Sequence, residues 1–72
     1  MAKQAARLRL RAWIDEQNLS ITDAARRMRI SRSLLSQLLH GSRMPGRQVA
    51  STIEIHSNSW DKGPIKVIDW DL

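Results

Sequence analysis

Residues 19–45 read LSITDAARRMRISRSLLSQLLHGSRMP, and this stretch decides the fold. Ser20 and Ser31 are good N-cap residues, and apolar residues with helical spacing follow each of them. The pattern predicts two short helices, over about 21–28 and 32–40. Only the two residues RI and the capping serine separate them, so the helices are joined by a tight turn.

Another helix is expected before this pair, over about residues 3–17. Its apolar residues recur at helical spacing and form one core-facing stripe. The stripe consists of Ala6, Leu10, Trp13 and Ile14. Asn18 and Gly41 follow the first and third of these helices, and both residue types tolerate the left-handed backbone that ends a helix. Three consecutive helices are therefore predicted in residues 3–41.

The helix over 32–40 has two chemically distinct faces. Its apolar face consists of Leu34, Leu35, Leu38 and Leu39. Its polar face consists of Arg32, Ser33, Ser36, Gln37 and His40. The polar face holds no acidic residue, and an acidic residue would repel phosphate. Arginine pairs with guanine, glutamine with adenine, and serine with several base edges, so this face suits the DNA major groove.

Charge is unevenly distributed along the 72 residues, whose net charge is +5. Residues 1–47 hold ten Lys and Arg against three Asp and Glu, a net +7, whereas residues 48–72 hold two against four, a net −2. Nine of the ten basic residues in the first part are arginines, which suits bidentate phosphate and guanine contacts. A basic first part indicates a polyanionic partner, although a solubilising surface is the alternative.

Composition argues against several other classes of protein. The chain has no cysteine, so disulfides and cysteine-based zinc sites are excluded and an intracellular, cytoplasmic protein is the simplest reading. Two histidines are too few for a metal site, and no serine–histidine–carboxylate arrangement or glycine-rich phosphate loop is evident. No apolar run reaches the length of a membrane span. We therefore expect no enzyme activity, no metal, no cofactor and no small-molecule ligand.

The last third of the chain contains two segments, residues 47–58 and 65–72, whose secondary structure can be interpreted in two ways. Residues 47–58 can form a helix with Val49, Ala50 and Ile53 on one face, but residues 52–56 also alternate as in a strand. We favour the helix. Residues 65–72 alternate as well and predict a C-terminal β-strand.

This predicted strand offers a way to form a dimer. Pairing with the same strand of a second subunit would use Ile68, Trp70 and Leu72 as contacts. The alternative is a tail that packs Trp70 on its own domain. We accordingly divide the chain into a DNA-binding domain, residues 1–62 with its motif at 20–40, and a strand or tail, residues 63–72.

The stretch 19–45 resembles the Cro/repressor (XRE-like) helix-turn-helix family of phage and bacterial regulators, and Cro most of all. The matching elements are Leu19, Ser20, Ala25, Ile30-Ser31, Arg32–Leu39, Gly41, Arg43 and Pro45. The resemblance implies a mainly α fold, a compact domain of four to five helices with the C-terminal strand. Some Cro proteins instead have a C-terminal hairpin, which leaves an α+β fold as the alternative.

Three residues depart from the family pattern. Ile21 stands where the family often has a glutamine that supports a phosphate contact, so more burial is expected there. Arg29 stands where glycine is common in the turn, which implies left-handed strain or a different turn. Leu39 stands where a glutamate is usual, and it adds to the apolar surface.

The resemblance also implies a function and a set of DNA contacts. Its base-reading positions fall on Arg32, Ser33, Ser36 and Gln37. Phosphate contacts fall on Ser20, Ser31, His40, Arg43 and Arg47, although the two serines can act as caps alone and the histidine can simply face solvent. The expected protein is a Cro-like repressor, bacterial or phage-encoded and nucleoid-associated, that binds a palindromic operator in double-stranded DNA as a homodimer. The alternative is an antitoxin-like or other protein-interaction module on the same scaffold.

Overall fold

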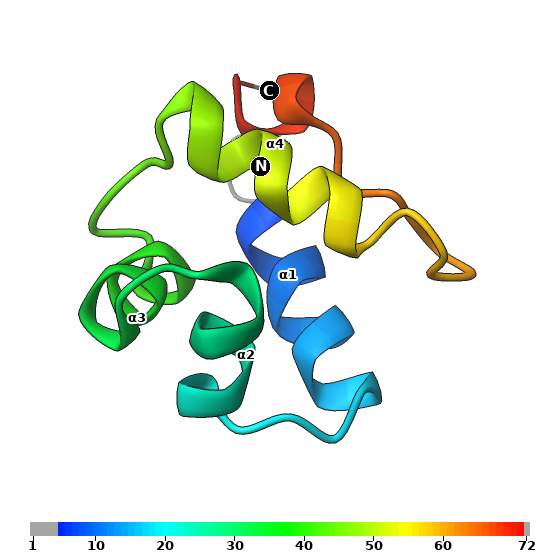
Figure 1. Ribbon diagram of the computed structural model, residues 1–72. Coiled ribbons are helices and arrows are strands. Elements are labelled where there is room, and N and C mark those ends of the chain that lie inside the picture. The colour runs from blue at the N-terminus through cyan, green and yellow to red at the C-terminus, as the bar shows by residue number, and fades with distance from the viewer. Residues whose placement is uncertain (1–4, 72) are drawn as a thin grey trace.

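The computed structural model describes residues 5–71, which form four α-helices and one 3-10 helix (Figure 1). In chain order these are α1 (Ala5–Glu16), α2 (Ile21–Met28), α3 (Arg32–His40), α4 (Arg47–His56) and η2 (Val67–Asp71). No strand occurs among the described residues. The mainly α fold of four to five helices expected from the sequence is thus confirmed, while the C-terminal strand and the alternative hairpin are not found among these residues.

The two serines cap their helices as expected. The Ser20 hydroxyl accepts a hydrogen bond from the Asp23 backbone N–H at 3.0 Å, and the Ser31 hydroxyl accepts one from the Leu34 N–H at 3.0 Å. Each cap satisfies one of the N–H groups that the first turn of a helix leaves without a partner. The starts of α2 and α3 are therefore set by local sequence.

Left-handed residues end the first three helices. Asn18, Arg29 and Gly41 have φ values of 57°, 58° and 79°. After α2, the Arg29 N–H bonds the Arg26 carbonyl and the Ile30 N–H bonds the Ala25 carbonyl, which is the Schellman pattern. The expected left-handed strain at Arg29 is confirmed, because a β-carbon makes this conformation costly for residues other than glycine.

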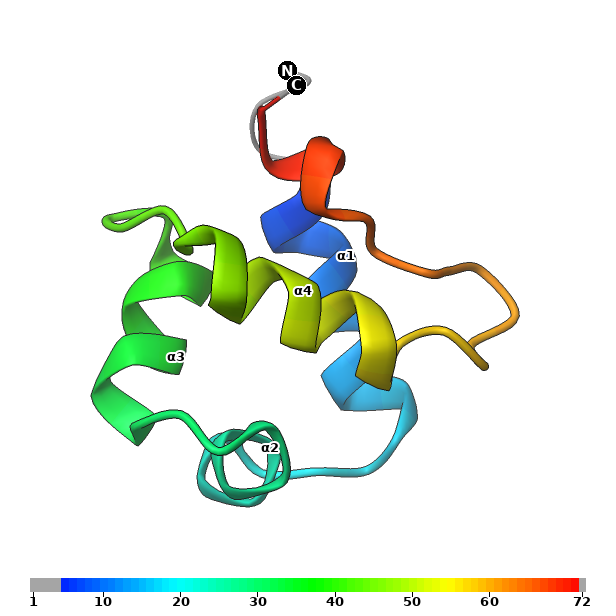
Figure 2. The ribbon, with the colours of Figure 1, turned by 45° about the horizontal axis from the view of Figure 1, so that its top comes forward.

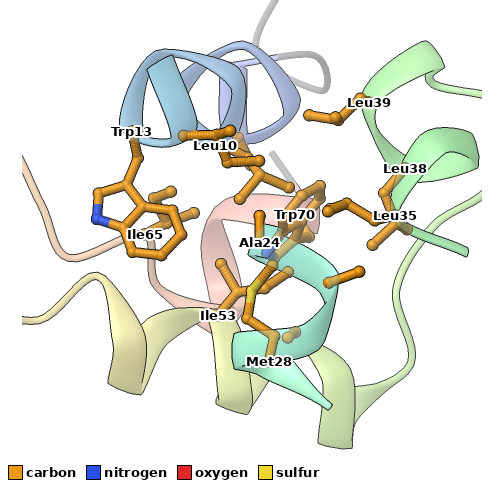
Figure 3. Packing of buried hydrophobic residues seen from close by; sticks show 14 of the residues in the cluster. Leu10, Trp13, Ala24, Met28, Leu35, Leu38, Leu39, Ile53, Ile65 and Trp70 are labelled. Atoms are coloured by element: carbon orange, nitrogen blue, oxygen red, sulfur yellow. The ribbon is translucent and has the colours of Figure 1, made fainter. Parts of the chain in front are cut away.

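All four helices and the tail contribute to one hydrophobic core (Figure 3). The core residues are Ala6, Leu10, Trp13, Ile14, Ala24, Ala25, Met28, Leu35, Leu38, Leu39, Ala50, Ile53, Trp60, Ile65 and Trp70. The stripe predicted on α1 is buried in full. α2 contributes two alanines at its centre, Ala24 and Ala25, and their small side chains let neighbouring helices approach closely.

Residues 47–56 form a helix, and side-chain burial explains why the strand interpretation is wrong. In a strand, Ile53 and Ile55 would share one face, because side chains alternate with a period of two. Instead Ile53 is fully buried and Ile55 is 72% exposed. Ala50 is buried with Ile53, at the three-residue spacing of a helix.

The C-terminal strand prediction is wrong because side chains of the same subunit take the backbone N–H groups that a strand would offer to a partner. The Ile65 N–H donates to the Ser57 hydroxyl at 2.9 Å, and the Val67 N–H donates to a Glu54 carboxylate oxygen at 3.1 Å. The Lys66 N–H donates to Asp69 at 2.9 Å. Residues 67–71 consequently wind into η2, which lies beside α4 (Figure 2).

The dimer contacts predicted on the strand have three different outcomes. Trp70 is 4% exposed and packs inside its own subunit, as in the alternative interpretation of the tail. Ile68 is 62% exposed. Leu72 lies outside the described residues.

Two side chains of α1 bond residues of the segment that follows α4, and one of them reaches the tail. Arg9 donates to Asp69 at 3.2 Å and to the Lys62 carbonyl, and its guanidinium carbon lies 5.6 Å from the centre of a Trp60 ring. Glu16 accepts hydrogen bonds from the Trp60 indole N–H at 3.0 Å and from the Lys62 ammonium at 2.8 Å. These bonds favour the carboxylate form and lower the pKa of Glu16, and the same carboxylate raises the pKa of Lys62.

Candidate nucleic-acid interface

The exposed edge of α3 carries the four residues expected to read bases. Arg32, Ser33 and Gln37 are exposed and Ser36 is half-buried. Within residues 5–71 none of these side chains forms a hydrogen bond or an ion pair, so their donors and acceptors face solvent. The opposite face of α3 is buried, which orients this edge outward. The arrangement supplies a row of polar groups without a negative charge.

The residues expected to contact phosphate lie at the ends of the helices. Ser20 and Ser31 are exposed N-caps of α2 and α3, and each hydroxyl can still donate a hydrogen bond while it accepts one from the backbone. His40, Arg43 and Arg47 are exposed at the end of α3, in the following loop and at the start of α4. The structure therefore places all five at the surface. In the sequence, the two serines precede the base-reading residues of α3, and the other three residues follow them.

Arg7 is a functional candidate that the sequence reasoning did not single out. It donates a hydrogen bond from Nη1 to the Leu39 carbonyl at 3.1 Å, across 32 residues of sequence. A β-carbon at Gly41 would lie 3.0 Å from Arg7 Nε, so glycine permits this close approach. Arg7 also lines a cavity of about 250 Å³ with His40 and Arg43. The Lys3–Arg7–Arg11 spacing marks a basic ridge in the sequence, but no local signal points to α3.

Two departures from the family pattern have structural consequences here. Ile21 is half-buried and packs against the core, which fits the burial expected at that position. Leu39, expected to add to the apolar surface, is instead 3% exposed and belongs to the core. Because a leucine stands where the family usually has a glutamate, this position offers no carboxylate to a basic partner. Instead its backbone carbonyl accepts the hydrogen bond from Arg7.

Several exposed arginines among residues 5–71 form no ion pair with an acidic residue of that part of the chain. Ion pairs join Arg9 to Asp69 and Lys62 to Glu16, both between α1 and the segment that follows α4. The exposed arginines outside these pairs are Arg11, Arg26, Arg27, Arg29, Arg32, Arg43 and Arg47. Unpaired positive charges raise the local concentration of a polyanion and speed its encounter with the protein.

Comparison with known protein families decides the assignment. The family model described as helix-turn-helix matches residues 10–55, from the middle of α1 to near the end of α4. The chain belongs to the helix-turn-helix family of the XRE type. This helix-turn-helix protein is accordingly a DNA-binding transcription regulator, with double-stranded DNA as its partner. Comparisons with curated proteins and with solved structures gave no match.

Residues 5–71 contain no group of three or more His, Cys, Asp or Glu side chains placed to hold a metal ion. Among these residues, too, no helix combines the length and the apolar character that crossing a membrane requires.

Proposed function

We propose that this helix-turn-helix protein is a Cro-like repressor that binds a palindromic DNA operator as a homodimer. The observation that carries the proposal is the exposed edge of α3, where four polar side chains without partners face solvent and the opposite face is buried. In this proposal α3 enters the major groove with its N-terminus first. Arg32 pairs with a guanine, Gln37 with an adenine, and Ser33 and Ser36 with neighbouring base edges.

The surrounding residues position the protein on the sugar–phosphate backbone. Ser20 and Ser31 present hydroxyl and backbone donors at helix N-termini, where the helix dipole favours an anion. His40, at the C-terminal end of α3, and Arg43 and Arg47 beyond it supply further donors. These contacts add affinity that depends on salt and not on sequence.

The dimer contact is proposed at Ile68. Its side chain is 62% exposed on η2, while Trp70 packs beneath this surface inside its own subunit. Residues 63–72 are thus proposed to be an element that packs on the domain of residues 1–62 and presents an apolar contact. Replacing Ile68 with serine is expected to shift a dimer to a monomer in sedimentation equilibrium, whereas Ile55→Ser, at another exposed isoleucine, leaves the dimer intact.

An antitoxin-like module that docks a protein through α3 has less support. A protein-docking face needs exposed large apolar residues. In the part of the chain that the structure describes, such residues are Leu8, Met44, Ile55 and Ile68, all of them outside α3. The polar edge of α3 therefore favours DNA over protein as its partner.

Selection from a pool of random double-stranded DNA tests the repressor proposal. We expect enrichment of a short palindrome, with affinity that falls steeply as salt rises. Gln37→Ala is expected to cost about 1–3 kcal/mol on the selected site and to relax the preference at one base pair, whereas Arg43→Ala weakens binding to all sequences alike. Failure to enrich any sequence would contradict the proposal.

A further inference from the structure

A basic groove of about 530 Å³ lies between α4 and the turn that follows α2. Arg27 and Arg29 line it from the α2 side, and Gln48 and His56 line it from α4. These four residues are exposed. No acidic residue lines the groove. Its volume falls in the range of ordinary ligand sites.

The donors in this groove are not engaged by the protein itself. Within residues 5–71 the side chains of Arg27, Arg29 and Gln48 form no hydrogen bond or ion pair. Arginine presents a planar fork of donors that matches a phosphate group, and a glutamine amide adds a neutral donor. These exposed side chains of the groove thus have the chemistry of a phosphate-binding site.

The backbone at Arg29 is a second observation at the same place. Its φ is 58°, a conformation that glycine adopts without steric cost. Here an arginine occupies it, and its side chain lines the groove. Strain of this kind persists where the surrounding structure or a function requires the side chain.

The floor of the groove is apolar. Met28 is 2% exposed and Val49 is half-buried, and both line the groove. An inorganic ion gains no favourable contact from an apolar floor, whereas the carbon face of a deoxyribose can pack on it. The groove therefore fits a phosphate that is attached to a sugar.

We propose that this groove binds a sugar–phosphate group through Arg27, Arg29, Gln48 and His56. Two sources have this chemistry: the DNA backbone beside the operator, and a free nucleotide. For the DNA source the inference rests on the proposed function. Two proposed phosphate contacts are sequence neighbours of residues that line the groove. Ser31 directly follows the turn, and Arg47 directly precedes Gln48.

The test uses the full chain and a double variant, Arg27→Ala with Arg29→Ala. The matched control is Arg11→Ala with Arg26→Ala, which removes the same charge from exposed residues that do not line the groove. Circular dichroism establishes that both variants are folded. Fluorescence anisotropy with duplex DNA then measures how steeply log affinity falls with log salt. Thymidine monophosphate at millimolar concentration is titrated separately against amide resonances.

Each result decides the proposal. If the groove binds the DNA backbone, the plot of log affinity against log salt becomes less steep by about 2 in the groove variant than in wild type. In the control variant the slope changes clearly less. For the nucleotide source, thymidine monophosphate shifts the amides of the groove in wild type and not in the groove variant. Equal slopes in the two variants, together with no nucleotide-dependent shifts, overturn the groove proposal. If wild type also fails to bind DNA, the repressor proposal falls with it; normal DNA binding by wild type leaves that proposal standing.

Discussion

The guanidinium of Arg7 in α1 lies 3.1 Å from the backbone carbonyl oxygen of Leu39 in α3 and donates a hydrogen bond to it. The last carbonyls of a helix lack partners within the helix and carry partial negative charge, so a cation there is favoured. This contact joins the first helix to the end of the helix that carries the proposed base-reading edge. It also fixes the point from which the loop toward Arg43 departs.

Removing this contact is expected to destabilise the fold. Arg7→Ala should lower the free energy of unfolding by about 1–2 kcal/mol, because a charge-assisted hydrogen bond in a half-buried place is lost. Arg7→Lys retains one donor and should lose less. Urea denaturation followed by circular dichroism measures both, and equal stability of wild type and Arg7→Ala would contradict the prediction.

Glycine at position 29 is expected to stabilise the protein. Arg29→Gly relieves the left-handed conformation, which costs about 1–2 kcal/mol for residues with a β-carbon, but glycine adds about 0.5–1 kcal/mol of entropy to the unfolded chain. A net gain of up to about 1.5 kcal/mol should remain. Arg29→Ala keeps the β-carbon and should be nearly neutral, so thermal unfolding of the pair separates backbone strain from the loss of charge.

Substitutions at Ser31 separate its capping role from its proposed phosphate contact. Ser31→Ala should cost about 1 kcal/mol of stability, because the Leu34 N–H loses its partner. Ser31→Asp caps the helix equally well and should keep stability, yet its charge should weaken DNA binding by about 1 kcal/mol or more. Normal DNA affinity of the Ser31→Asp protein would rule out a phosphate near this hydroxyl.

The hydroxyl of Ser57 is expected to hold the tail in place. It is fully buried, donates to the Ile53 carbonyl at 2.7 Å and accepts from the Ile65 N–H at 2.9 Å. Ser57→Ala leaves a buried N–H without an acceptor and should cost about 1–3 kcal/mol. The exposed Ser59, changed to alanine, is the control and should stay near wild type in urea denaturation.

Stability should depend on pH through Glu16. Hydrogen bonds from Lys62 and Trp60 lower its pKa in the folded protein below the ordinary value of 4.5. A group with a lowered folded pKa stabilises the fold above its unfolded pKa and loses that effect as pH falls through the folded value. Acid should therefore weaken wild type below about pH 4.5. In urea titrations, Glu16→Gln should flatten this dependence.

The contribution of Lys62 to stability depends on pH in the opposite direction. Its pKa is raised by the same carboxylate, so its contribution is present below the ordinary value of 10.5 and is lost as pH rises through the folded value. Removing Glu16 should abolish both dependences together, since each group is the principal cause of the other's shift.

The features that could be predicted from sequence depend on neighbouring residues. The caps at Ser20 and Ser31, the left-handed end at Asn18 and the polar edge of α3 each follow from residues within about one turn of helix. Burial of Leu35 and Leu38 follows from the same periodicity. These local signals were sufficient for the α2–α3 motif and for its outward-facing side chains.

The tail shows where local signals fail. The alternation from residue 65 onward is the same whether the segment pairs as a strand or packs as η2. The decision depends on Glu54 and Ser57, which take its backbone N–H groups, and on Arg9, which bonds Asp69. Periodicity within one segment cannot show that partners elsewhere in the chain will engage its backbone.

The sequence by itself thus determined the helical motif, its boundaries and the exposed polar edge of α3 that we propose meets DNA, because helix caps and amphipathic spacing act over a few residues. Only the tertiary structure decided that Arg7 holds the end of α3, that Trp70 is core and not a strand contact, and that Arg27, Arg29 and His56 line one groove. Those relationships join residues far apart in the chain, and they arise only when α1, α4 and the tail pack together.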